Sequence, residues 1–204
     1  MGQQKNRGGK DKGSPSGRLR IVAGKWRSRL LPVADEAGLR PTPERVRETL
    51  FNWLSPEIEG KKCLDLFAGS GALGLEALSR GAASVVFVEN SANAARVLRD
   101  NISLLQASGA VVYETDAMTL VDTDAVGEFD IVFLDPPFAA DLLEDLCRLL
   151  AGSGKLSSNA KIYLEQERNQ SFPALPAGWS LLKDKVAGNV RYCLVDASII
   201  EAKS

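Results

Sequence analysis

Residues 64–74 read "LDLFAGSGALG", and Gly69, Gly71 and Gly74 within them reproduce the pattern G-x-G-x-x-G. The glycines follow an apolar, strand-like run and open a helical pattern, which is the context in which this fingerprint binds a nucleotide-containing ligand. The first two glycines let the backbone turn and approach a ligand, while Gly74 lets the helix pack closely on the sheet. The stretch therefore predicts a parallel α/β sheet with a ligand site at this loop.

The rest of the chain supports an α/β, Rossmann-like fold, because short β-branched runs alternate with helical patterns from residue 61 onward. The sequence ends differently, with two strand-like runs in "SLLKDKVAGNVRYCLVDA" that join at Gly188 and Asn189. This turn predicts that the mostly parallel sheet finishes with an antiparallel hairpin. We expect strands near residues 62–66, 84–89, 110–114, 130–134 and 160–165, and helices near residues 72–80, 91–107 and 140–151.

Composition divides the chain into three parts. Residues 1–17 are rich in Gly and Lys and show no apolar periodicity, which predicts a disordered basic leader. Residues 18–54 predict a basic hairpin followed by a helix, with Thr42 as its N-cap and Pro43 as its first helical residue. Residues 55–204 are expected to form the main domain.

Charge is distributed unevenly along the chain. Residues 1–47 hold 12 Lys and Arg against 4 Asp and Glu, whereas the remaining residues hold 13 against 22. Such asymmetry is typical of a nucleic-acid contact, although solvated basic tails share it. The candidate contact residues are the basic side chains of the N-terminal hairpin and helix: Arg18, Arg20, Lys25, Arg27, Arg29, Arg40, Arg45 and Arg47.

Several classes of chemistry are excluded by composition. Histidine is absent, which removes Ser-His and Cys-His nucleophile systems and most zinc sites. Cys63, Cys147 and Cys193 are odd in number and far apart, so we expect reduced thiols and no metal site. Because neither a signal-peptide core nor a run of about 18 apolar residues is present, we expect a cytoplasmic protein without a membrane segment.

Acidic residues surround the glycine loop. Glu89 ends the next strand, where a carboxylate can accept hydrogen bonds from two ribose hydroxyls. Asp65 and Asp116 follow strands at the same edge, and each would repel a pyrophosphate by roughly 3 kcal/mol per charge pair. S-adenosylmethionine carries positive charge and no phosphate, so it suits these carboxylates better than a nicotinamide dinucleotide does. For Asp65 or Asp116 alone, a capping or turn role stays open. The candidate cofactor residues are Asp65, Phe67, Gly69, Gly71, Glu89, Asn90, Asp116 and Ala117.

A second motif, "FLDPPF" at residues 133–138, directly follows the fourth expected strand. Two prolines can continue neither strand nor helix, so Asp135 and the carbonyl of Pro136 are presented at the strand's end. Two acceptors can hold the hydrogens of a nucleobase amino group and free its lone pair for a methyl group, while Phe138 offers a stacking face. The motif predicts methyl transfer to a base amino group, with four candidate catalytic residues: Asp135, Pro136, Pro137 and Phe138.

With these motifs the chain resembles the class I S-adenosylmethionine-dependent methyltransferases, and within them the RsmD family of ribosomal RNA guanine-N2 methyltransferases. The resemblance spans residues 18–196 and includes "RIVAGKWRSRLLP", "LRPTPERVRETLFNWL" and "DKVAGNV". It implies a sheet of seven strands and methylation of guanine N2 in 16S rRNA of a small-subunit assembly particle. It also implies RNA contact through the basic N-terminal extension. We expect a monomer.

Alternative functions stay open at this point. An adenine-N6 DNA methyltransferase needs the same DPPF chemistry, but also a target-recognition domain for which about 40 basic-rich residues leave little room. A non-catalytic RNA-binding assembly factor would retain the cofactor pocket, although the intact residues 135–138 argue against it. An oxidoreductase would require that nicotinamide cofactors bind and S-adenosylmethionine does not.

Overall fold

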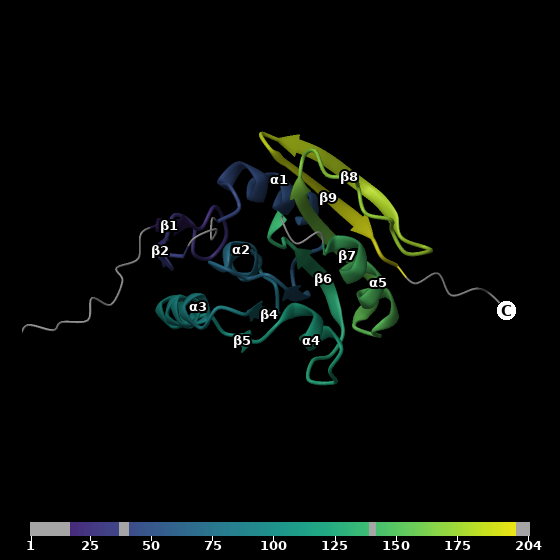
Figure 1. The fold of residues 1–204 in the computed structure, drawn as a ribbon. Coiled ribbons are helices and arrows are strands. Elements are labelled where there is room, and N and C mark those ends of the chain that lie inside the picture. Colours follow the sequence, from purple (N-terminus) through teal and green to yellow (C-terminus); the bar gives the residue numbers. More distant parts are fainter. Residues whose placement is uncertain (1–16, 37–40, 139–141, 199–204) are drawn as a thin grey trace, which may run out of the picture.

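A seven-stranded sheet forms the centre of the protein in the computed structural model, which describes residues 17–36, 41–138 and 142–198 (Figure 1). The strands are β3 (Lys62–Asp65), β4 (Ser84–Glu89), β5 (Ala110–Glu114), β6 (Phe129–Leu134), β7 (Leu156–Glu167), β8 (Ser180–Ala187) and β9 (Val190–Asp196). Their spatial order is β5-β4-β3-β6-β7-β9-β8. The strands from β5 to β7 pair in parallel, whereas β9 runs antiparallel to both β7 and β8. The predicted fold and the C-terminal antiparallel hairpin are confirmed.

Helices cover both faces of this sheet (Figure 1). One face packs against α1 (Glu44–Leu54), α2 (Ala72–Ser79) and α3 (Ala92–Leu105). The other packs against α4 (Ala117–Val121) and α5 (Leu143–Gly152). The short helix α4 was not expected, and β7 begins earlier than its predicted start near residue 160. Both faces of the parallel strands are therefore buried, which explains their continuous apolar runs.

The N-terminal extension packs on the sheet domain. Strands β1 (Gly17–Arg20) and β2 (Leu30–Val33) form the expected hairpin, in which Leu19 lies opposite Leu31. Both leucines are buried in the same apolar cluster as α1 and α2. The predicted leader lies outside the described residues, apart from Gly17. The predicted N-cap is wrong, because Pro43 occupies that position and the Thr42 side chain makes no capping bond.

Three further observations concern the cysteines, the lengths of the helices and the grouping of metal-binding side chains. All three cysteines are free and buried. Within the described ranges, no helix is long and apolar enough to cross a membrane. Across the same ranges, no group of three or more His, Cys, Asp or Glu side chains is arranged to hold a metal ion.

Candidate active site

The glycine loop between β3 and α2 has the geometry that the sequence predicts. Gly71 lies at φ 78°, in the left-handed region that favours glycine, and a Cβ there would overlap the Leu98 side chain. A Cβ on Gly74 would overlap the ring of Phe87 on β4, which confirms that this glycine lets the helix lie close to the sheet. The loop backbone is therefore fixed at the carboxyl edge of the sheet.

Glu89, at the end of β4, is held by this loop. Its Oε2 accepts a hydrogen bond from the backbone N–H of Gly69 at 2.8 Å, and its Oε1 accepts one from that of Ser91 at 2.7 Å. A carboxylate has about four acceptor positions, so two directions stay available for ribose hydroxyls. The neighbouring Asn90 is exposed.

Asp65 lies beneath the loop as a buried carboxylate. Its Oδ2 accepts a hydrogen bond from the backbone N–H of Gly74 at 3.0 Å. The pKa of Asp65 is raised to about 7, mainly by burial and also by the negative charges of Asp135 and Glu89, while hydrogen bonds from the backbone act in the opposite direction. Three carboxyl groups that repel one another in this way favour a cationic ligand and disfavour a pyrophosphate. The site therefore fits the positively charged part of S-adenosylmethionine.

Asp116, after β5, caps helix α4. Its Oδ1 accepts hydrogen bonds from the backbone N–H groups of Met118 and Thr119 at 2.9 and 3.1 Å. One carboxylate oxygen of Asp116 therefore has the helix-capping role that the sequence had left open. Asp116 is also exposed, while Ala117 beside it is buried, so a contact to the cofactor's adenine stays a prediction.

Asp135 follows β6 and lines a small cavity of about 30 Å³, together with Asp65, Phe67 and Thr42 among others. The Thr42 Oγ1 donates a hydrogen bond to Asp135 Oδ2 at 3.2 Å, a contact that the sequence did not predict. Burial raises the pKa of Asp135 to about 6, and the Thr42 hydrogen bond acts in the opposite direction.

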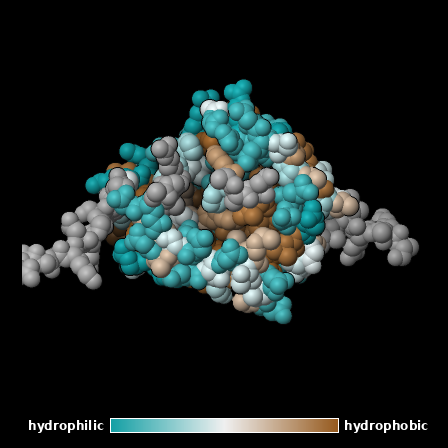
Figure 2. Space-filling view, viewed as in Figure 1, coloured by the Kyte–Doolittle hydropathy of each residue, from teal (hydrophilic) through white to brown (hydrophobic). Residues whose placement is uncertain are grey.

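A second hollow is a cleft of about 300 Å³, within the size range of small-molecule sites. Pro136, Pro137 and Phe138 line it, together with residues that follow β7. The Gln170 Nε2 donates a hydrogen bond to the Phe138 carbonyl at 2.7 Å, which joins the two walls of the cleft. Figure 2 shows hydrophobic residues gathered near the centre of this view, in the region where Figure 1 places β6.

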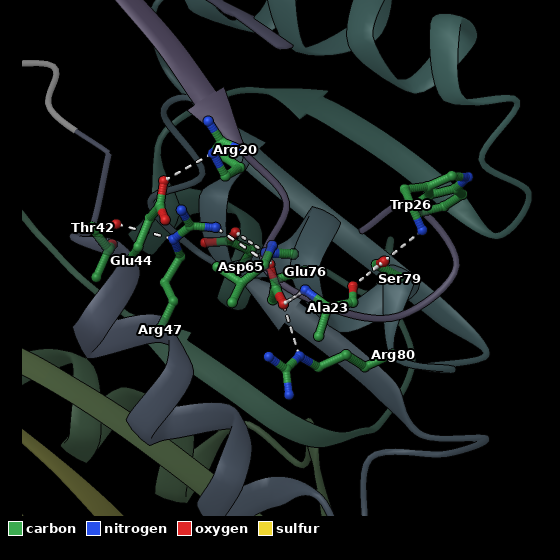
Figure 3. A network of polar contacts seen from close by, with 12 residues as sticks. Arg20, Ala23, Trp26, Thr42, Glu44, Arg47, Asp65, Glu76, Ser79 and Arg80 are labelled. Atoms are coloured by element: carbon green, nitrogen blue, oxygen red, sulfur yellow. Dashed lines mark hydrogen bonds and ion pairs between the residues drawn. The ribbon is translucent and has the colours of Figure 1, made fainter. Parts of the chain in front are cut away.

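A buried ionic network joins the N-terminal extension to α2 (Figure 3). Glu76 accepts hydrogen bonds from the backbone N–H groups of Val22 and Ala23, and it pairs with Arg47 at 3.3 Å and with Arg80 at 2.8 Å. Arg47 is only 1% exposed. The prediction that Arg47 contacts RNA is therefore wrong, because its guanidinium is enclosed and already paired.

The other basic candidates are placed differently. Six of them are exposed: Arg18, Arg20, Lys25, Arg27, Arg29 and Arg45. Arg40 lies outside the described residues. An RNA-contacting surface on the extension stays a prediction for these side chains.

The strand order, the glycine loop after β3 and the Asp-Pro-Pro-Phe motif after β6 define a class I methyltransferase fold. A family model described as "Conserved hypothetical protein 95" matches residues 19–196. Ribosomal RNA small subunit methyltransferase D of Escherichia coli K12 is 50% identical over 181 residues, which is 89% of this chain and 91% of that protein. The protein of the same name from Haemophilus influenzae is 46% identical, and the match covers 87% of this chain and 93% of that protein.

Solved structures show the same likeness. A putative methyltransferase from Escherichia coli superposes with a TM-score of 0.83 at 46% identity, covering 89% of this chain and 99% of its own. A putative methylase from Haemophilus influenzae gives a TM-score of 0.78 at 42% identity, and the match covers 90% of this chain and 100% of that one. The chain therefore belongs to the RsmD family of methyltransferases.

Sequence reasoning missed the contact of Thr42 with Asp135 and the buried role of Glu76, and it misassigned Arg47. Thr42 carried no signal of its own, because its partner Asp135 is 93 residues away. Glu76 did carry one, since a glutamate inside the apolar helix "ALGLEALS" requires a buried partner. That requirement indicates a basic partner, but the sequence does not say which one; the structure provides both Arg47 and Arg80.

Proposed function

We propose that this protein transfers a methyl group from S-adenosylmethionine to N2 of a guanine in 16S rRNA of a small-subunit assembly particle. The observation that carries the proposal is the placement of the Asp-Pro-Pro-Phe motif: Asp135 lines an acidic cavity with Asp65, and Phe138, three residues further on, lines a cleft. The names of the close relatives support ribosomal RNA as the substrate class.

The cofactor supplies a methyl group that is activated by the positive charge on its sulfur. Asp65 would accept hydrogen bonds from the cofactor's amino group, and its burial makes a cationic partner favourable. Glu89 would accept the ribose hydroxyls, because the bonds from Gly69 and Ser91 fix its orientation. Asp116 would contact the adenine amino group.

On the substrate side, Asp135 and the Pro136 carbonyl would accept the two amino hydrogens of the target base. Phe138 would stack on the base, a contact worth about 1–3 kcal/mol. The base has to leave its stack in the RNA to reach this position. Alignment of the amino group supplies most of the acceleration, and the product's extra proton goes to water or to Asp135.

A transfer assay tests this proposal. Small-subunit particles and naked 16S rRNA from a strain that lacks the gene are incubated with the purified protein and methyl-labelled S-adenosylmethionine. Mass spectrometry of the nucleosides should find N2-methylguanosine, and mapping should place it at a single nucleotide. Labelled N6-methyladenine in DNA would favour the alternative enzyme, and cofactor binding without any transfer would favour a non-catalytic assembly factor.

A further inference from the structure

The cleft lined by Pro136 and Phe138 contains a buried carboxyl group with no role in the chemistry above. Glu165 lies near the end of β7, lines the cleft and is 4% exposed. Its Oε2 accepts a hydrogen bond from the Tyr163 hydroxyl at 2.6 Å. Its Oε1 accepts none from any residue that the structure describes. One carboxylate oxygen is therefore available to a ligand in the cleft.

Sheet register places this group beside Asp135. Strands β6 and β7 pair in parallel with Leu134 opposite Leu164, so Asp135 and Glu165 are the next residues on adjacent strands. The pKa of Glu165 is raised to about 8, first by burial and then by the negative charge of Asp135, while the hydrogen bond from Tyr163 lowers it. The two carboxyl groups are therefore close enough to repel each other. A ligand that donates hydrogen bonds to both carboxylates at once would relieve this repulsion.

Gln166, the next residue along β7, also belongs to the lining of the cleft, but its side chain points to the opposite face of the sheet from that of Glu165. Gln166 is 3% exposed, and its Nε2 donates hydrogen bonds to the carbonyls of Gln170 and Ser171. Its Oε1 is buried and has no partner among the described residues. A buried acceptor without a donor is unfavourable, and such groups are rare in folded proteins. Glu165 therefore provides the acceptor on the face of the sheet that also carries Tyr163.

We propose that Glu165 recognises the Watson–Crick edge of the target guanine by accepting a hydrogen bond from its N1–H, beside the amino group held by Asp135. This inference rests on the proposed function and adds base selectivity to it. Guanine presents a ring N–H next to its amino group, whereas adenine and cytosine present a ring nitrogen lone pair there. Above the raised pKa of Glu165, its carboxylate attracts the N–H and repels the lone pair, so the same residue favours guanine and rejects the other two bases.

The test compares two bases at the nucleotide mapped in the transfer assay. Particles are reconstituted with RNA that carries either guanine or 2-aminopurine there, since 2-aminopurine keeps the 2-amino group but has a lone pair at N1. Single-turnover rates on both are measured for the wild-type protein, Glu165→Gln and Glu165→Ala at a pH above the pKa of Glu165, which is about 8. Glu167→Gln is the matched control, because it makes the same change two residues along β7 and outside the cleft.

The wild-type protein and Glu167→Gln should methylate guanine about tenfold to 100-fold faster than 2-aminopurine, the range for losing a hydrogen bond to a charged group. Glu165→Gln should bring this ratio to one or below, because its amide can donate to N1 of 2-aminopurine, and Glu165→Ala should bring it close to one. The ratio is independent of the folded fraction of a preparation.

Three results would overturn the assignment: a wild-type ratio near one, an unchanged ratio in the Glu165 variants, or a Glu165→Gln protein that binds S-adenosylmethionine yet methylates neither base. Failure of the proposed function itself would look different, because the wild-type protein would then form no N2-methylated guanine at all.

Discussion

Thr42 Oγ1 donates a hydrogen bond to Asp135 Oδ2 at 3.2 Å, which connects the N-terminal extension directly to the candidate catalytic carboxylate. The backbone carbonyl of Thr42 in turn accepts a hydrogen bond from Arg47 Nε at 3.0 Å, and Arg47 pairs with Glu76 on α2. The extension therefore supports the active site as well as presenting basic side chains to solvent. The contributions to catalysis and to RNA binding that we propose for the extension can therefore be tested separately.

Replacing Thr42 with Val should raise the pKa of Asp135 above its value of about 6, because the hydroxyl hydrogen bond lowers that pKa. The methyl-transfer rate with saturating cofactor should fall at acidic pH as Asp135 becomes protonated. In Thr42→Val this fall should begin at a pH up to about one unit higher, with little change at alkaline pH. Thr49→Val is the control, since the Thr49 hydroxyl bonds only its own helix. Superimposable pH profiles for Thr42→Val and wild type would show that the hydroxyl does not act on Asp135.

Replacing Arg47 with Met should destabilise the free protein by about 3 kcal/mol, because it removes one partner of a buried ion pair. The same change at the exposed Arg27 should alter stability by less than about 0.5 kcal/mol. Urea denaturation without RNA measures both free energies of unfolding. Equal stabilities of the two variants would mean that the Arg47–Glu76 pair does not anchor the extension.

Asp65→Asn should stabilise the cofactor-free protein at alkaline pH. The pKa of Asp65 is raised to about 7 by burial, so its favourable contribution is present below the ordinary value of 3.8 and is lost as pH rises through about 7. Asn cannot ionise, so at pH 8 the variant should be more stable by about 1–4 kcal/mol, and this difference should vanish near pH 4.

Asp130 provides a control, because its pKa is lowered in the folded protein, whereas that of Asp65 is raised. Hydrogen bonds from the Lys62 backbone and the Lys61 side chain outweigh its burial and lower its pKa, so Asp130→Asn should destabilise the protein at pH 8.

Calorimetry should also show weaker S-adenosylmethionine binding for Asp65→Asn. An Asp65→Asn protein with wild-type stability at pH 8 and wild-type cofactor affinity would rule out both roles of this carboxylate.

Neutralising Arg27 and Arg29 together should weaken RNA binding without changing cofactor affinity. The slope of log K against log salt should fall by about 0.7 for each lost single-strand phosphate contact. Arg96→Gln with Arg99→Gln on α3 makes a matched double variant, because both of those arginines are also exposed. RNA affinity that drops equally in both double variants would point to net charge and not to a surface on the extension.

The sequence predicts most of the sheet because local patterns determine it. Gly71 and Gly74 are required by a turn and by a close helix–strand contact, and both requirements can be recognised within a few residues. The two arginines of "ERVRE" show the opposite case. Arg45 is exposed and Arg47 is buried, and the difference depends on Glu76, which comes close only when the chain folds.

The candidate site was predictable where it follows strand ends, as at Asp65, Glu89 and Asp135. Glu165 also follows this rule, because it lies near the end of the strand that neighbours β6, but its role requires the register of β7. Thr42 could not be found in this way, since it approaches the site from a segment that precedes the sheet. A monomeric state and a cytoplasmic location stay predictions.

Asp135 provides the most direct test of the whole account. If its carboxylate contacts the target amino group and not the cofactor's adenosine, Asp135→Ala should keep its fold and most of its S-adenosylmethionine affinity. Methyl transfer should nevertheless fall by at least about 100-fold to 1000-fold, as when one preorganised hydrogen-bonding group is removed from an active site. Asp135→Asn keeps an acceptor oxygen without the charge, so it should retain more activity than Asp135→Ala if acceptor geometry matters most.

The deciding measurement is the single-turnover rate of the wild type, Asp135→Ala and Asp135→Asn with saturating cofactor and small-subunit particles from the strain that lacks the gene. We expect the Ala variant to bind the cofactor and transfer almost no methyl groups, with the Asn variant between it and the wild type. Transfer by the Ala variant at the wild-type rate would remove Asp135 from the mechanism and contradict the proposed active site.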